Sequence, residues 1–161
     1  MTSRRTSRGL TLVEILVVML LIAITAAAAM PTVTSMVGRG RVENIAAELV
    51  SMAQWSRTEA IRRQQKVTML TSADGRRLGA YLYAGTALQQ QLRLVTTATN
   101  TLVTASIVLP FQSDRGFTLP TPTTITVSNS STDATLSVIV NSAGLASICA
   151  PGGGFPGYPA C

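Results

Sequence analysis

Histidine is absent from this 161-residue sequence, and several other residue types are scarce. There are two cysteines, seven acidic side chains and only 4% aromatic residues. The lack of histidine excludes a Ser–His–Asp triad and a histidine-rich zinc site, and two cysteines alone cannot supply the four ligands of a structural zinc site. Because 47% of the residues are apolar, a single domain of this length would have a mainly aliphatic core.

No pair of carboxylates stands where acid–base chemistry would need it. The sequence contexts of Asp74, Asp114 and Asp133 are turn-like, and turns favour Asp for local hydrogen bonds. The three glycines at 152–154 do not form a phosphate-binding loop, because neither a Lys-Ser or Lys-Thr pair nor an expected helix follows them. The sequence therefore predicts a protein that is not an enzyme and that uses no cofactor and no metal ion.

The net charge of +6 is unevenly distributed. Three of the basic residues precede the first apolar run, namely Arg4, Arg5 and Arg8. No charged side chain then occurs from Ile15 to Gly38. As a helix, residues 10–30 would be about 32 Å long, which matches the roughly 30 Å hydrocarbon core of a bilayer. Arginines before this span predict a cytoplasmic N-terminus.

Three interpretations of the apolar run compete. It is a secretory signal cut within Ala26–Ala29, a twin-arginine signal that begins at Ser3-Arg4-Arg5, or a permanent membrane span. Glu14 favours the last, because a carboxylate inside such a segment costs about 2.5–3.5 kcal/mol and a disposable signal has no use for it. A carboxylate in this position needs a partner.

The motif Gly9-Leu10-Thr11-Leu12-Val13-Glu14 resembles the class III signal of type IV pilins and pseudopilins, with leucine in place of the usual phenylalanine. This resemblance implies cleavage by prepilin peptidase between Gly9 and Leu10, and N-methylation of the new Leu10 amine. It also implies that Glu14 pairs with the N-terminal amine of a neighbouring subunit in a filament. Pro31 stands where pilin helices often carry a kinking proline.

The helical pattern continues beyond Pro31 and becomes amphipathic. Spacings of three and four residues predict one apolar stripe, formed by Val42, Ile45, Ala46, Leu49, Met52, Ala53, Ser56 and Ala60. A second face carries Glu48, Trp55, Glu59 and Arg62. We interpret this second face as solvated, with a subunit-contact face as the alternative, and expect Glu59 to meet Arg62 or Arg63.

The segment 56–65 is similar to the end of the helix in the GspH/FimT branch of minor pilins and pseudopilins. A basic cluster lies here, formed by Arg57, Arg62, Arg63 and Lys66. These cations either complement the helix dipole or contact DNA. Relatives that bind DNA tend to carry Gly-Arg-x-Arg near the last strand, whereas this chain has Gly144-Leu145-Ala146-Ser147, which argues against DNA binding.

Beyond Lys66 the composition shifts to residues that favour strands and turns. Strands are expected at 67–71, 78–84, 91–97, 102–109, 123–127 and 135–140, with turns at 72–75 and 111–116 and an ambiguous, loop-like stretch at 98–106. The fold class is therefore α+β, pilin-like. A long N-terminal helix packs through its second half on an antiparallel β-sheet domain that forms one sheet or two small ones.

The last thirteen residues begin and end with cysteine. The eleven residues between Cys149 and Cys161 are rich in glycine and proline and would be disordered without a tether. A disulfide around such a loop contributes about 3 kcal/mol, and it persists in the periplasm, where the segment after the span would lie. We therefore predict a Cys149–Cys161 bridge. Phe155 and Tyr158 either dock a partner or pack beneath the loop.

The expected organisation is a leader (1–9), a transmembrane and filament-core helix (10–30), an amphipathic helix (31–65), a sheet domain (66–148) and a disulfide-closed loop (149–161). Removal of the leader leaves ten basic and seven acidic side chains, a net charge of +3. The resemblance implies a minor type IV pilin at or near the filament tip. The alternatives are a GspH-like pseudopilin of type II secretion and a FimT-like DNA-binding pilin. The implied partners are prepilin peptidase, other pilins and the inner membrane, with a periplasmic C-terminal domain before export into the pilus.

Overall fold

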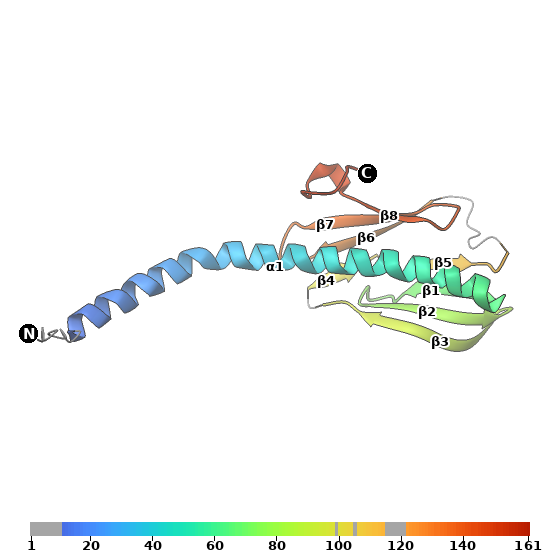
Figure 1. Cartoon of the computed structure of the whole chain (residues 1–161), viewed down its shortest axis with the longest axis horizontal. Coiled ribbons are helices and arrows are strands. Elements are labelled where there is room, and N and C mark those ends of the chain that lie inside the picture. Colours follow the sequence, from blue (N-terminus) through green and yellow to red (C-terminus); the bar gives the residue numbers. More distant parts are fainter. Residues whose placement is uncertain (1–10, 99, 105, 115–121) are drawn as a thin grey trace, which may run out of the picture. The chain divides into compact units, whose positions relative to one another are not determined.

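A computed structural model describes residues 11–98, 100–104, 106–114 and 122–161 (Figure 1). The chain divides into two compact units, Met1–Ser35 and Met36–Cys161, and the helix α1 (Leu12–Arg63) has residues in both. Gly9 and Leu10, where processing is predicted, lie outside the described residues.

The first unit contributes the N-terminal part of α1, whose side chains from Leu12 to Thr34 are all exposed. The helix is long and apolar enough in this part to cross a membrane. The hydroxyl of Thr25 in this part is satisfied locally, because its Oγ1 donates to the carbonyl oxygen of Leu21 at 2.9 Å. Such internal pairing keeps a polar group compatible with an apolar environment.

The second unit contains two four-stranded antiparallel sheets. Sheet A has the order β3-β2-β1-β5 and sheet B the order β4-β6-β7-β8. The strands are β1 (Lys66–Thr71), β2 (Arg77–Ala84), β3 (Ala87–Thr96), β4 (Thr101–Val103), β5 (Val108–Phe111), β6 (Thr123–Asn129), β7 (Thr135–Val140) and β8 (Ala146–Cys149). A short 3-10 helix, η1 (Pro151–Gly153), follows β8. The predicted α+β class, with a long N-terminal helix and antiparallel sheets, is confirmed.

One hydrophobic core joins the second half of α1 to both sheets, which flank it in Figure 1. The apolar stripe predicted from the sequence is confirmed, since all of its members from Val42 to Ala60 are buried. From sheet A the core receives residues such as Met69 and Phe111, and from sheet B residues such as Ile125. The helix therefore packs because its apolar positions repeat at 3.6-residue spacing.

The single strand predicted at 102–109 is wrong. Its two ends belong to different sheets, because β4 pairs with β6 in sheet B and β5 pairs with β1 in sheet A. Between them Ser106 has a φ of 57°. The chain therefore passes from sheet B to sheet A between β4 and β5. The hydroxyl of Thr71 stabilises this connection, since it donates to the carbonyl oxygen of Thr104 and accepts from the Ile107 amide, both at 2.8 Å.

The other expected turns and strands agree with the structure in part. The turn after β1 is confirmed at 72–75, and Gly75, with a φ of 65°, leaves no room for a Cβ because the Val103 carbonyl oxygen lies 2.4 Å from that position. Strand β3 begins at Ala87 instead of Gln91, and β8 was not predicted. Part of the turn expected at 111–116 lies outside the described residues.

Candidate functional site

Glu14 is the only charged side chain of α1 before Arg39. With Ile15, Val18, Met19 and Ile22 it lines a shallow groove of about 220 Å³ along one side of the helix. These apolar neighbours are each about half exposed or more. The carboxylate therefore lies in an apolar surface that no described part of this chain covers.

The backbone of Glu14 also takes part in capping the helix. Its amide donates to Thr11 Oγ1 at 3.3 Å, while the Ile15 amide donates to the Thr11 carbonyl oxygen at 3.2 Å. The pair Thr11 and Glu14 has the Thr-x-x-Glu spacing of a capping box, in which an acidic residue in the first turn also complements the helix dipole. Glu14 thus has a local structural role in addition to the predicted assembly role.

Pro31 lies inside α1, where it supplies no amide for a helical hydrogen bond. Its own carbonyl oxygen accepts from Thr34 Oγ1 at 2.9 Å. The helix continues through this position to Arg63.

The predicted contact at the C-terminal end of α1 is present, and its centre is Glu59. Arg62 donates to both oxygens of this carboxylate, at 2.9 Å from Nε and 2.6 Å from Nη2, and Arg63 Nε donates to Oε1. Glu59 is only 6% exposed, so its assignment to a solvated face is wrong. The two arginine side chains cover a carboxylate that the helical wheel alone places beside the apolar stripe.

These hydrogen bonds from Arg62 and Arg63 lower the pKa of Glu59 from 4.5 to about 2, against the opposing effect of burial. The same pairing raises the pKa of Arg62. Two of the four cations proposed as DNA contacts therefore share one carboxylate. Lys66 is instead the exposed first residue of β1, and the half-buried Arg57 has no hydrogen-bond partner for its Nε among the described residues.

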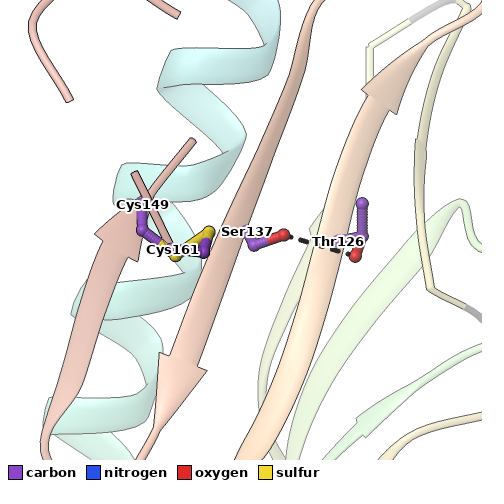
Figure 2. The surroundings of a disulfide bond; sticks show 4 residues. All are labelled: Thr126, Ser137, Cys149 and Cys161. Atoms are coloured by element: carbon purple, nitrogen blue, oxygen red, sulfur yellow. Dashed lines mark hydrogen bonds between the residues drawn. A yellow bond between two sulfur atoms is a disulfide. The ribbon is translucent and has the colours of Figure 1, made fainter. Parts of the chain in front are cut away.

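The predicted disulfide between Cys149 and Cys161 is confirmed, with the two Cα atoms 4.9 Å apart. Figure 2 shows it at the end of β8, beside Ser137 of β7, whose hydroxyl lies 3.5 Å from Thr126 Oγ1. The loop is also closed by its backbone, because the Ala150 amide donates to the Pro159 carbonyl oxygen at 2.8 Å. Backbone pairing and the covalent bond thus fix the same two ends.

Aromatic side chains hold this loop against the rest of the second unit. Phe155 is 7% exposed and belongs to the core, and Tyr158 packs edge-on against it with ring centroids 5.5 Å apart. The hydroxyl of Tyr158 donates to Glu43 Oε1 of α1 at 2.7 Å, which raises the pKa of the phenol. Of the two alternatives left open by the sequence, the structure supports packing beneath the loop. No sequence signal links Tyr158 to Glu43, which is 115 residues away.

The turn before β8 carries no positive charge. Gly144 has a φ of 74°, and Asn141 Oδ1 accepts from the Ala143 and Leu145 amides at 3.0 and 2.9 Å. Leu145 and Ser147, which stand at the two arginine positions of DNA-binding relatives, are both exposed. Neutral side chains here offer no ion pair to a phosphate.

Comparison with protein families finds two models that match different parts of the chain. Residues 46–144, more than half of the chain, match the family described as type II transport protein GspH. Residues 4–30 match the prokaryotic N-terminal methylation motif. No curated protein sequence matches the chain.

Solved structures of similar fold include a minor pilin and a minor pseudopilin. The chain in a crystal structure of the type IV minor pilin FimU of Pseudomonas aeruginosa is 22% identical with a TM-score of 0.59, and the match covers 74% of this chain and 96% of that chain. The minor pseudopilin EpsH of the Vibrio cholerae type 2 secretion system is 19% identical with a TM-score of 0.56, covering 70% of this chain and 98% of EpsH. Together with the family models, this fold shows that the chain belongs to the GspH family of type IV pilin-like proteins, the minor pilins and pseudopilins.

Proposed function

We propose that the chain is a minor type IV pilin, a structural subunit that acts in assembly at or near the tip of the filament. The observation that carries this proposal is Glu14 in the exposed apolar surface of residues 12–34. A bilayer covers such a surface but leaves the carboxylate without a partner, whereas a bundle of like helices supplies both apolar cover and a cation.

The cation would be the N-terminal amine of a neighbouring subunit, freed when prepilin peptidase cuts between Gly9 and Leu10. Pairing neutralises both groups inside the bundle and sets the axial register between two helices, because only one alignment brings the amine to Glu14. Before assembly the chain would be anchored in the inner membrane by its N-terminal helix, with its C-terminal sheet domain in the periplasm. The match of residues 4–30 to the N-terminal methylation motif supports this processing.

Two variants separate the capping role of Glu14 from its assembly role. Glu14→Gln keeps a residue that functions in a capping box but removes the charge, and Glu14→Val removes both. We expect both variants to insert in the membrane and to be missing from sheared filaments, as measured by immunoblots of the two fractions. If Glu14→Gln assembles normally and only Glu14→Val fails, the charge has no role in assembly.

The leader is tested by the N-terminus of the mature protein. We expect mass spectrometry to find methylated Leu10 as its first residue, and Gly9→Glu to leave the precursor uncut. Gly9→Ala is the matched control and should still be processed, at a reduced rate at most. A mature chain that begins at Ala29 or Met30 would show an ordinary secretory signal instead.

The type II secretion role is a second candidate, because the matching family model is described as a type II transport protein and EpsH shares the fold. Deleting the gene separates the two roles. Loss of surface pili with normal secretion of exoproteins supports the pilus role, and the reverse result supports the secretion role. The genes beside it, from a pilus or a secretion operon, provide an independent check.

DNA binding has the least support. Glu59 binds Arg62 and Arg63, and the turn before β8 is neutral. We expect no salt-sensitive shift of duplex DNA by the purified protein in a gel assay. A tight shift that weakens steeply with salt would restore this function.

A further inference from the structure

The outer faces of the two sheets, which point away from the shared core, differ in chemistry. In sheet B the outward positions are mainly hydroxyls, for example Thr124, Thr126 and Ser128 of β6. This is the usual pattern for an antiparallel sheet with one solvated face. In sheet A the outward positions include the leucines, tyrosines and valine Leu70, Tyr81, Tyr83, Leu88, Leu94 and Val108.

The register of β2 and β3 creates this apolar face. On these two strands Leu94 lies opposite Gly79, Gln91 opposite Tyr81 and Leu88 opposite Tyr83. The six residues of these three pairs therefore occupy outward positions of sheet A. Leu88 and Leu94 are six residues apart, so alternation alone would place both on this face, and the two register shifts bring Gln91 to the same side. Leu88 and Leu94 are 57% and 46% exposed, and β3 is an edge strand of sheet A.

A hollow of about 300 Å³ lies in this face and depends on a glycine. The ring of Tyr81 lies over Gly79, where an added Cβ would meet the ring at 2.5 Å. Leu70 and Leu94 form apolar walls of the hollow, and Arg77 is among its polar lining residues. The volume is at the lower end of the range for ligand sites and fits one or two side chains of a partner.

The charge on sheet A has one sign. Its four strands contain no carboxylate and three cations, Lys66, Arg77 and Arg93. Arg93 lies opposite Ala80 on the inner face and binds Glu48 of α1 at 2.5 Å. Lys66 and Arg77 lie on the outer face, opposite Tyr83 and Thr96. In the turn before β2, the Asp74 carboxylate accepts from Ser72, which lines the hollow, and its pKa is lowered mainly by that bond and in smaller part by the charge of Arg77. The outward positions of the strands still favour an occupant with apolar side chains and a negative charge.

We propose that the outer face of sheet A binds an extended segment of another protein that presents apolar side chains and a carboxylate on one face, with the carboxylate at Arg77 and an apolar side chain in the hollow beside the Tyr81 ring. Charge complementarity selects this occupant. A second copy that used the same face would bring like charges together. A nucleic acid would find two cations among the outward positions of these four described strands, beside leucine side chains, which is too few for binding dominated by phosphates. The proposal does not depend on which filament or secretion system the chain serves.

The test uses the full chain in lipid nanodiscs and a synthetic peptide that carries a benzophenone, acetyl-Leu-Thr-Asp-Thr-Leu-amide, whose two leucines and aspartate share one face when the peptide is extended. After illumination, mass spectrometry locates the cross-links. We expect them on β1, β2 and β3, with a yield about tenfold lower in Arg77→Glu. The matched control is Arg76→Glu, which changes the adjacent exposed residue outside the hollow and should keep the yield. Leu94→Ser, checked by its melting temperature, is a second variant that should also lower the yield.

Three results would overturn the proposal. The first is cross-links elsewhere, or equal yields in Arg77→Glu and Arg76→Glu. The second is equal or stronger labelling by the same peptide with lysine in place of aspartate. The third is displacement of the acidic peptide by oligothymidylate, which would assign the face to single-stranded nucleic acid.

Discussion

The two halves of α1 use similar apolar residues for different purposes. Leu16 and Leu20 in the first half are 60% and 61% exposed, whereas Leu49 and Met52 in the second half are fully buried. The first half is apolar on every side, and the second half on one stripe. An apolar stripe can be buried by packing on one sheet domain. A helix that is apolar on every side is buried only when lipid or other helices surround it.

Charged residues show the same division. In the second half Glu43, Glu48 and Glu59 each bind a side chain of this chain. In the first half, the carboxylate group of Glu14 has no side-chain partner among the described residues; only its backbone amide binds a side chain, that of Thr11. The second half is thus completed by folding, and the first half by assembly or insertion.

Truncating one leucine in each half of α1 should give the largest difference between them. Leu49→Ala should lower the free energy of unfolding of the second unit by about 2–5 kcal/mol, because it leaves a cavity between α1 and the sheets. Leu20→Ala removes the same atoms from an exposed position and should leave that unfolding unchanged. Chemical denaturation followed by the fluorescence of Trp55 measures both. Equal losses would show that the first half also stabilises the head.

Removing the disulfide is the next largest perturbation. Cys149→Ser with Cys161→Ser should destabilise the second unit by about 3 kcal/mol, because the unfolded chain regains the entropy of the open loop. Melting with and without a reductant measures the effect in the unaltered chain. Membrane insertion, a property of the first half, should not change. An unaltered melting temperature would mean that Phe155 and Tyr158 hold the loop without the covalent bond.

The sequence predicted the features that depend on local periodicity and composition. The apolar stripe, the α+β class and strands β1, β2, β6 and β7 follow from spacing and from β-branched residues flanked by turns. The cysteine pairing followed from the compartment and from a tail that cannot order itself.

Features that depend on pairing between strands far apart in the sequence could not be predicted. The residues of β4 and β5 are equally good strand formers, and only the pairing of Val103 with Val127 and of Val108 with Leu70 assigns them to different sheets. The outer face of sheet A was not predicted for the same reason, since it depends on the pairing of β3, β2, β1 and β5 in one sheet. Glu59 was misplaced because a helical wheel does not show where the arginine side chains fold back.

Gly38 marks the beginning of the packed half, and a glycine pair locates that boundary. A Cβ at Gly38 would meet Thr132 Cγ2 at 2.6 Å, whereas a Cβ at Gly40 has nothing within 4 Å. Gly38→Ala should destabilise the second unit by about 1 kcal/mol, since overpacking outweighs the gain in helix propensity. Gly40→Ala should stabilise it by about 0.5–1 kcal/mol. Melting temperatures that rise in both variants would place the start of the packed half further along α1.

The smallest expected effect concerns Glu59, the carboxylate that the second half neutralises by itself. Its folded pKa of about 2 lies below the ordinary value of 4.5, so its contribution to stability is complete above about pH 4.5 and is lost as the pH falls toward 2. Arg62 is 67% exposed in its side chain, so we expect only about 1 kcal/mol of stability to be lost. Glu59→Gln should lower the melting temperature near pH 7 and should flatten its decline between about pH 4.5 and pH 2, because the carboxylate whose folded and unfolded pKa values span that range is gone. If the wild-type and Glu59→Gln proteins decline in parallel, Glu59 is not held by its arginines in solution. The contrast with Glu14, whose partner must come from another chain, would then no longer separate the two halves of α1.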